Sequence, residues 1–386
     1  MDNVTHTLFA LTLARTPLGR AGRGTTAALV LASNAPDVDI VATLGGAESY
    51  LRWHRGPTHG ALGVIALGLL AAGLVYAAMR LSDRKRQGSR SAPTQGREHG
   101  TPDPSREAER AASLPMLAAI SMIGVLFHVL MDLPTSYGTR LLSPFDWHWW
   151  AVDWMPIIDV YLLVALAAGL AFGRVSGVAS RRNAAIVLAL MAANYGVRGV
   201  AHHQALTTAP RLFGPLFPPR CDPSSSDRRA IERWPQHLRA TPPDPAKRCL
   251  VQLVALPTFF SPFKWRVVAH LSNAYEVHDV DLLDARLRRP ADASEVLWRT
   301  TLRIPNVWTP PVWTAASTEL GRTFLGFARL PAARAFVDPF GTATVRWNDM
   351  RFLGMRRSLG PAQNDPFSVV IRIAPDGHVL AEQLVP

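Results

Sequence analysis

The sequence predicts an all-α polytopic membrane domain followed by a small β-rich C-terminal domain. Apolar runs of nearly membrane-spanning length crowd into the first two hundred of the 386 residues. From about residue 248, short runs rich in β-branched and aromatic residues alternate with turn residues. The net charge of +12 comes mostly from arginines that flank the apolar runs, which favours a bilayer partner. No basic stripe with interleaved aromatics occurs, so we expect no nucleic-acid partner.

Two apolar stretches at the N-terminus, residues 7–14 and 25–33, are too short to cross a bilayer. The basic sequence RTPLGRAGRG joins them. A re-entrant or interfacial helical hairpin is allowed where its backbone is buried against protein. We therefore expect these stretches to form a short N-terminal helical hairpin.

Four later segments are each close to the roughly 20 apolar residues that a membrane span needs. They are residues 60–79, 114–131, 156–173 and 184–201. With the hairpin they make residues 1–201 a membrane domain of about four spans. The polar segment 81–112 within it is rich in Gly, Pro and Ser and predicts a disordered loop.

The remaining chain divides into a proline-rich linker over residues 202–247 and a β-rich domain over residues 248–386. Strand-like runs with turn residues between them support the second assignment. These runs cover residues 248–256, 264–271, 295–304, 342–349, 367–373 and 378–385.

The distribution of arginine and lysine predicts the orientation. Loops 80–113 and 174–182 carry most of these residues, and the loops between them carry few. By the positive-inside rule the two basic loops are cytoplasmic, which places the C-terminal domain outside a cell (inner) membrane. That location permits a disulfide between Cys221 and Cys249. Two unpaired thiols in a core are an equal alternative.

The same orientation brings several polar residues to the extracytoplasmic ends of different helices. His59 opens the first span, the pair His128 and Asp132 closes the second, and Asp159 lies in the first turn of the third. If the hairpin assignment holds, the remaining members of this group are His6, Asp37, Asp39 and His54.

Each of these residues also has a structural interpretation. His128 and Asp132 are four residues apart and so lie on one helix face, yet a histidine near a helix end is often only an interior residue. Asp37 and Asp39 follow Pro36 and suit a turn or a cap. Asp159 is harder to explain in this way, because ionisable residues inside apolar spans are costly and usually functional.

Histidine and aspartate together, without cysteine, suit a divalent metal. Zinc is the first expectation, with manganese or iron as alternatives, and magnesium if carboxylates dominate. The group has more donors than one ion needs, so we expect two or more ions that clamp a nucleophile and a leaving oxygen. Arg55 and Arg140 suit either a substrate phosphate or lipid headgroups.

Five sequence motifs resemble the YdjM-like family of membrane-bound metal-dependent hydrolases. They are MDNVTHTLFALTLA, SNAPDVDIV, WHRGPTHGALG, HVLMDLPTSYGTRLLSPF and WWAVDWMPIIDV, which cover roughly residues 1–200. The resemblance implies a distant similarity to zinc-dependent phospholipase C and P1-type nucleases, and hence phosphoester hydrolysis. It also implies a ligand set of His6, Asp37, Asp39, His54, His59, His128, Asp132 and Asp159.

These observations predict a membrane-bound metal-dependent hydrolase of a phosphoester or lipid-linked substrate. We expect the catalytic residues to be Asp39 as a base, His59, and Arg55 as an anion contact. The alternative is a non-catalytic metal-binding membrane protein, either a transporter or a scaffold. The position of the polar residues at span ends argues against transport, which needs polar residues near mid-span.

Overall fold

The computed structural model describes residues 1–88, 111–175, 180–213, 217–221, 249–288, 302–352 and 368–385. The chain forms two compact units. The first consists of Met1–Val38, Pro57–Leu133 and Ile157–Tyr195, and the second of Asp39–Gly56, Pro134–Pro156 and Gly196–Pro386. Most of the predicted loop 81–112 and of the predicted linker 202–247 lies outside the described residues.

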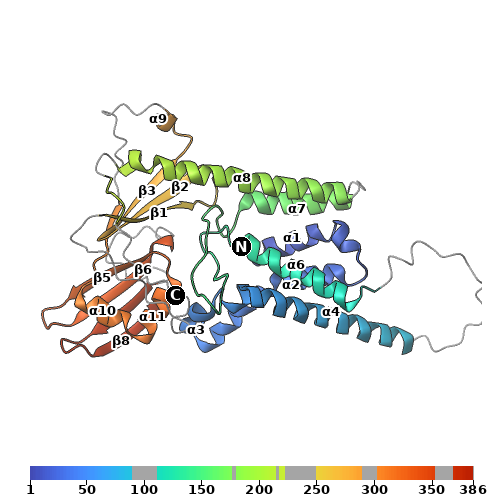
Figure 1. Ribbon diagram of the computed structural model, residues 1–386, viewed down its shortest axis with the longest axis horizontal. Coiled ribbons are helices and arrows are strands. Elements are labelled where there is room, and N and C mark those ends of the chain that lie inside the picture. The colour runs from blue at the N-terminus through green and yellow to red at the C-terminus, as the bar shows by residue number, and fades with distance from the viewer. Residues whose placement is uncertain are drawn as a thin grey trace, which may run out of the picture. The chain divides into compact units, whose positions relative to one another are not determined.

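The first unit is helical. Its elements are α1 (Asn3–Leu13), η1 (Pro17–Arg20), α2 (Thr25–Asn34), η3 (Pro57–His59), α4 (Ala61–Gly88), α6 (Leu114–Asp132), α7 (Val160–Val175) and the first part of α8 (Ser180–Phe213). Between α2 and η3 the chain forms η2 (Pro36–Gly45) and α3 (Ala47–Trp53). Helix α6 packs along α4 and α2, and α1 lies against α2 and α7 (Figure 1).

Small residues allow these helices to approach closely, as is common between membrane helices. Ala28 and Ala72 are buried together between α2 and α4, and Ala32 lies beside Ala71 and α6. A side chain at Gly68 would lie 2.9 Å from the Cα of Met122 on α6. Glycine at this position is therefore required for the contact between α4 and α6.

Helices α4, α6 and α8 are long and apolar enough to cross a membrane. A fourth span is possible if α2 and η2, which meet at an angle of 45°, are counted as one broken span. Helix α7 has a shorter apolar stretch, Val160–Gly173. A helical region with three to four candidate spans is thus confirmed. The predicted span 156–173 corresponds to the shorter helix α7, so four spans at the predicted positions stay a prediction.

The second unit contains two four-stranded antiparallel sheets. The first has the order β1-β2-β3-β4, formed by Leu250–Pro257, Lys264–Leu271, Ala274–Asp281 and Leu302–Pro305. The second has the order β5-β6-β7-β8, formed by Pro331–Val337, Ala343–Asp349, Ser368–Ile373 and Val379–Val385. The described residues also form α9 (Ala285–Arg288), α10 (Pro310–Ala316), α11 (Glu319–Phe327) and η4 (Met350–Phe352). A C-terminal part with two antiparallel sheets confirms the predicted β-rich character.

Helix α8 runs twelve residues past the predicted end of the fourth span. The reason is tertiary packing, because Ala205 and Ala209 in this extension are buried against Trp265 and Val267 of β2. Figure 1 shows α8 beside this sheet. Just after the helix, Cys221 forms a disulfide with Cys249 at the start of β1.

Candidate metal centre

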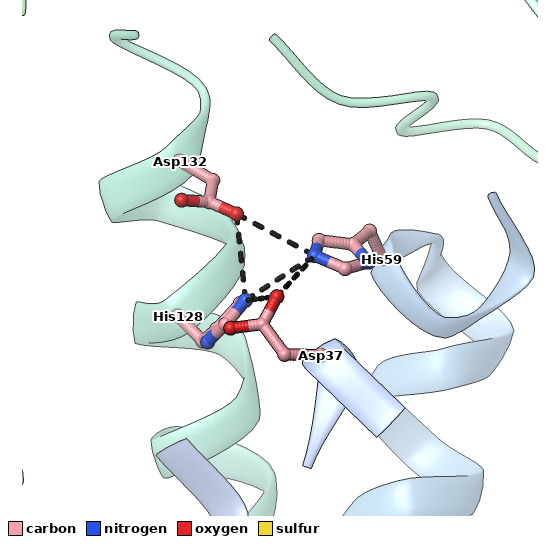
Figure 2. Close-up of side chains that lie close together, drawn as sticks. All are labelled: Asp37, His59, His128 and Asp132. Atoms are coloured by element: carbon pink, nitrogen blue, oxygen red, sulfur yellow. Dashed lines mark hydrogen bonds and ion pairs between the residues drawn. The ribbon is translucent and has the colours of Figure 1, made fainter. Parts of the chain in front are cut away.

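Four donor side chains from three parts of the first unit point toward one another (Figure 2). His128 lies on α6, and Asp132 follows it by one turn at the end of the same helix. His59 ends η3, and Asp37 lies at the start of η2. Three of the four are fully buried, whereas the side chain of Asp37 is 18% exposed. This group is the one set of metal-competent donors found among the described residues.

The distances between donor atoms fall in a narrow range. The Nε2 atoms of His59 and His128 are 3.2 Å apart. Each of them lies 3.4 Å from Oδ2 of Asp132 and 3.6 Å from Oδ1 of Asp37. Five of the six distances within the group are therefore between 3.2 and 3.6 Å.

These distances match the edges of a metal-sized tetrahedron. Bonds of about 2.0–2.2 Å from zinc to nitrogen and oxygen give edges of roughly 3.3–3.6 Å. An ion at the centre would also contact both imidazole nitrogens and both carboxylates. Buried carboxylates that lie this close together need such a partner. The residues present therefore fit a divalent ion.

Backbone and side-chain contacts orient both histidines. Nδ1 of His128 lies 2.7 Å from the carbonyl oxygen of Ser33, and Nδ1 of His59 lies 3.0 Å from Oγ1 of Thr58. A proton on Nδ1 leaves the lone pair of Nε2 to bind a metal ion. In both histidines Nε2 is the ring nitrogen that faces the other donors. Such outer contacts commonly fix the orientation of metal-binding histidines. Sequence analysis did not identify the Ser33 contact, because any residue type can supply a backbone carbonyl.

Proline and glycine shape the local backbone around two of the donors. Pro36 follows the end of α2 and begins η2, so that Asp37 leaves the direction of the preceding helix. After η3, a side chain at Gly63 would lie 2.3 Å from the carbonyl oxygen of Pro57. Only glycine therefore permits η3 to fold tightly onto the first turn of α4 and hold His59 in place.

His6 contacts the group from its outer side. Its ring stacks on that of His128 with centroids 3.8 Å apart, and its Nε2 lies 3.5 Å from Oδ1 of Asp132. The amino group of Met1 contacts the same oxygen. Since Oδ2 of Asp132 faces the other donors, His6 contacts the carboxylate oxygen that points away from them.

Asp159 does not lie inside the third span. It immediately precedes α7, and its Oδ1 accepts a hydrogen bond from the backbone N–H of Leu162 at 2.8 Å. Asn194 of α8 donates to the same oxygen at 3.2 Å. These contacts make Asp159 a helix cap, a role that aspartate commonly has. It is not among the four clustered donors.

Asp39, His54 and Arg55 lie together in the second unit. Oδ2 of Asp39 accepts the backbone N–H of Arg55 at 2.7 Å and lies 3.3 Å from Nδ1 of His54. Nε2 of His54 is 3.3 Å from the hydroxyl of Tyr50. The guanidinium of Arg55 donates to the carbonyl of Gly138 at 2.9 Å.

The two arginines considered as phosphate contacts are both buried in the second unit. The guanidinium of Arg55 lies over the ring of Tyr137, whose pKa is raised to about 12 by burial, so that the phenol is neutral at physiological pH. Arg140 donates to the carbonyl oxygens of Arg52 and Gly326 at 2.7 and 3.0 Å. These contacts hold backbone segments together.

The comparison with known protein families supports the resemblance in the sequence. Residues 1–205, more than half of the chain, match the family model of the YdjM inner membrane protein. The chain belongs to this family. A YdjM protein is an inner membrane protein, which agrees with the candidate spans of the helical unit.

The chain is also similar to the uncharacterized protein YfhP of Bacillus subtilis. The two sequences are 23% identical over 150 residues, which is 39% of this chain and 37% of YfhP. The alignment thus spans well under half of that relative. No solved structure is significantly similar to the chain. The chain is therefore a member of an inner membrane protein family, and its His/Asp cluster could hold a metal ion.

Proposed function

We propose that this protein is a membrane-bound metal-dependent hydrolase that acts on a phosphoester or lipid-linked substrate. One observation carries the proposal. Two histidines and two aspartates from η2, η3 and α6 present their donor atoms at distances of an ion's coordination shell. When bound, a divalent ion would supply Lewis acidity that polarises a phosphoryl oxygen and lowers the pKa of water.

In this proposal Asp37, His59, His128 and Asp132 hold the ion. Ser33 and Thr58 keep the two imidazole rings oriented through Nδ1. His6 positions Asp132 by contact with its outer oxygen. Asp37 is the most exposed of the four donors, so we place the approach of substrate on its side.

The other residues of the expected site have separate proposed roles. Asp39 remains the proposed base, and His54 is proposed to orient it. For Arg55 a positioning role is favoured over an anion contact, because its guanidinium already donates to Gly138. Asp159 is proposed as a helix cap that contributes to the shape of the unit.

The donor set leaves the metal open among zinc, manganese and iron. Four protein donors would complete a tetrahedral zinc site, and a catalytic zinc site usually keeps one position open. Manganese and iron have higher coordination numbers and would retain open positions beside four donors. A purely structural metal site is therefore the second candidate, and the closed tetrahedral spacing is the observation that favours it.

Turnover separates these two candidates. Purified protein loaded with zinc, manganese or iron should hydrolyse at least one member of a phosphoester panel that includes mono- and diesters. Asp132→Ala should lose that activity, because the ion loses a donor oxygen that lies 3.4 Å from both histidines. The substitution Asp279→Ala, at an exposed position on β3, is the matched control. Tight metal binding without turnover of any ester would favour the structural site.

We further propose about four spans, with the metal centre and the sheets of the second unit outside the cytoplasm. The arginine-rich loops support this orientation, and the disulfide between Cys221 and Cys249 is of the kind that persists in oxidising compartments. A reporter enzyme that folds only in the periplasm should be active when fused after Val385. A reporter that is active only in the cytoplasm should be inactive at the same position. The reverse pattern would place the metal centre inside the cell.

A further inference from the structure

The element that carries Asp37 exposes a stripe of apolar side chains. In a 3₁₀-helix, residues three apart lie above one another, so Val38, Val41 and Leu44 of η2 form one face. Their side chains are 48%, 54% and 88% exposed. Exposed large apolar residues that gather in one place usually mark an interaction surface.

The composition of η2 suits a lipid environment. Its two charged residues, Asp37 and Asp39, lie at its start, and no charged residue occurs from Ile40 to its end at Gly45. The hydroxyl of Thr43 donates to the carbonyl of Ile40 at 2.6 Å, so its hydrogen bond is satisfied within the helix. Backbone and hydroxyl groups that bond internally are tolerated next to hydrocarbon, where water is absent.

All four metal donors lie close in sequence to an exposed large apolar residue. Val38 follows Asp37 directly, and the others are Leu62 after His59, Leu126 before His128, and Leu130 before Asp132. None of these pairs is more than three residues apart. On α6, however, Leu126 and Leu130 are two residues from the donors and so lie on the outer face of the helix, away from them. The exposed apolar residue directly beside a donor is therefore Val38 of η2.

The bilayer is the occupant that best fits this surface. The chain belongs to an inner membrane family, and α4 and α6 are candidate spans. Together with α2, η2 also meets the length and composition of a broken span or re-entrant loop. The apolar stripe therefore lies on a pair of helices, α2 and η2, that already has the properties of a membrane segment.

We propose that η2 inserts into the bilayer and that the metal centre takes its substrate from the membrane. The substrate class is an amphiphile whose polar head contacts the donors while its hydrocarbon chains remain among lipids. The substrate half of this inference rests on the proposed hydrolase function, whereas the insertion of η2 does not.

Insertion can be measured with a fluorescent label. Leu44→Cys and, as a control, Phe340→Cys would each be labelled in lipid nanodiscs with an environment-sensitive fluorophore. The two positions are similarly exposed, at 88% and 86%, and Cys221 and Cys249 are paired in a disulfide. Nitroxide groups on lipid acyl chains should quench the label at position 44, and aqueous iodide should quench the label at position 340.

Equal quenching of both labels by iodide would overturn the insertion of η2. Protection of position 44 from both iodide and lipid nitroxides would also overturn it, because a protein partner would then cover the stripe. Neither result depends on turnover, so the hydrolase function is judged separately.

The substrate class is tested by comparing two phosphate monoesters. One is phosphatidic acid in phosphatidylcholine vesicles, and the other is soluble p-nitrophenyl phosphate. The double variant V41S/L44S should raise KM for the vesicle substrate by roughly tenfold or more, since two apolar side chains lose their lipid contacts. It should leave turnover of the soluble ester unchanged, and F336S/F340S, at exposed positions of β5 and of the turn after it, should change neither.

An equal loss on both esters in V41S/L44S would overturn the substrate class. Efficient hydrolysis of the soluble ester alone by wild type would do the same. Absence of turnover on either ester, with position 44 quenched by lipid nitroxides, would remove this substrate class but leave the insertion of η2 standing, and the phosphoester panel would judge the hydrolase function separately.

Discussion

His128→Ala is expected to abolish stoichiometric metal binding by the detergent-purified protein. The substitution removes one of four donors, and Nε2 of His128 is the atom nearest to His59 in the group, at 3.2 Å. Of the remaining donors, His59 and Asp132 are buried and Asp37 is 18% exposed, so the variant keeps only three protein ligands in a site with little access for water. Elemental analysis after dialysis against a weak chelator should find about one ion in wild type and none in the variant. His278→Ala, which also removes a buried histidine but in the second unit, should keep the ion.

Thr58→Val should produce a graded loss in the same measurement. The hydroxyl of Thr58 contacts Nδ1 of His59 and is not itself a donor to the ion. Loss of such an outer contact typically lowers metal affinity by about 10–100-fold, which competition with a chelator of known affinity can resolve. Thr58→Ser keeps the hydroxyl and should remain close to wild type.

The order of these effects is the critical result. If Thr58→Val loses as much metal as His128→Ala, or if His128→Ala still holds one ion tightly, the proposed four-donor site is wrong. Circular dichroism of each variant distinguishes loss of the ion from loss of the fold.

Helices α4, α6 and α8 were predictable as candidate spans because they depend on a single strong signal, an uninterrupted apolar run. The hairpins of the second unit were less so. Strand β3 was missed because two of its buried residues, Glu276 and His278, are polar and hide the apolar pattern. Strand β5 was missed because it begins with Pro331 and is rich in alanine, a composition tolerated at the edge of a sheet, where β5 lies.

Two helices of the second unit carried signals that the strand-based interpretation did not use. Thr309 before Pro310 and Pro311 is the pattern of a helix start, and α10 begins there. Thr318 caps α11 through the N–H of Gly321. Both helices lie between the predicted strands 295–304 and 342–349.

The four clustered donors are all among the eight ligands expected from the sequence, but the sequence does not tell which of the eight lie together. The i, i+4 spacing of His128 and Asp132 and the turn before His59 identified three of the clustered donors. Asp37 and Asp39 are only two residues apart, yet Asp37 joins the donors whereas Asp39 accepts the backbone N–H of Arg55. That choice depends on the backbone of η2, which sequence spacing does not determine. Asp159 shows the opposite case, because α7 begins at Val160, four residues after the predicted start of the third span, and Asp159 caps the helix instead of lying inside it.

Arg351→Met is expected to be among the most destabilising single substitutions in the second unit. Arg351 and Asp349 form an almost fully buried ion pair at 2.7 Å. The guanidinium also donates to the carbonyls of Tyr137 and Phe327 at 3.0 and 3.1 Å and lies over four aromatic rings. Breaking a buried pair on one side costs about 3–5 kcal/mol, because the other charge is left buried without a partner.

Arg266→Met is the matched control. Arg266 is also paired with an aspartate at 2.8 Å, but the carboxylate of Asp279 is largely exposed. Exposed pairs contribute about 0–1 kcal/mol. Thermal unfolding of the full chain in detergent should therefore show a large fall in Tm for Arg351→Met and little change for Arg266→Met. A similar Tm for the two variants would contradict a stabilising role of the buried pair.

The difference between Arg351→Met and wild type should shrink in acid. Burial acts to raise the pKa of Asp349, but Arg351 and the backbone N–H groups of Arg351 and Arg329 outweigh it and hold the pKa below its usual value. A carboxylate with a depressed pKa contributes stability above the unfolded pKa of about 3.9 and loses it as the pH falls through the folded value. Without Arg351 the burial effect dominates, the pKa of Asp349 rises, and the variant avoids the buried charge by binding a proton. The gap in Tm should thus be widest near neutral pH and narrow toward about pH 4, and a gap that is constant with pH would point to lost packing instead of lost charge pairing.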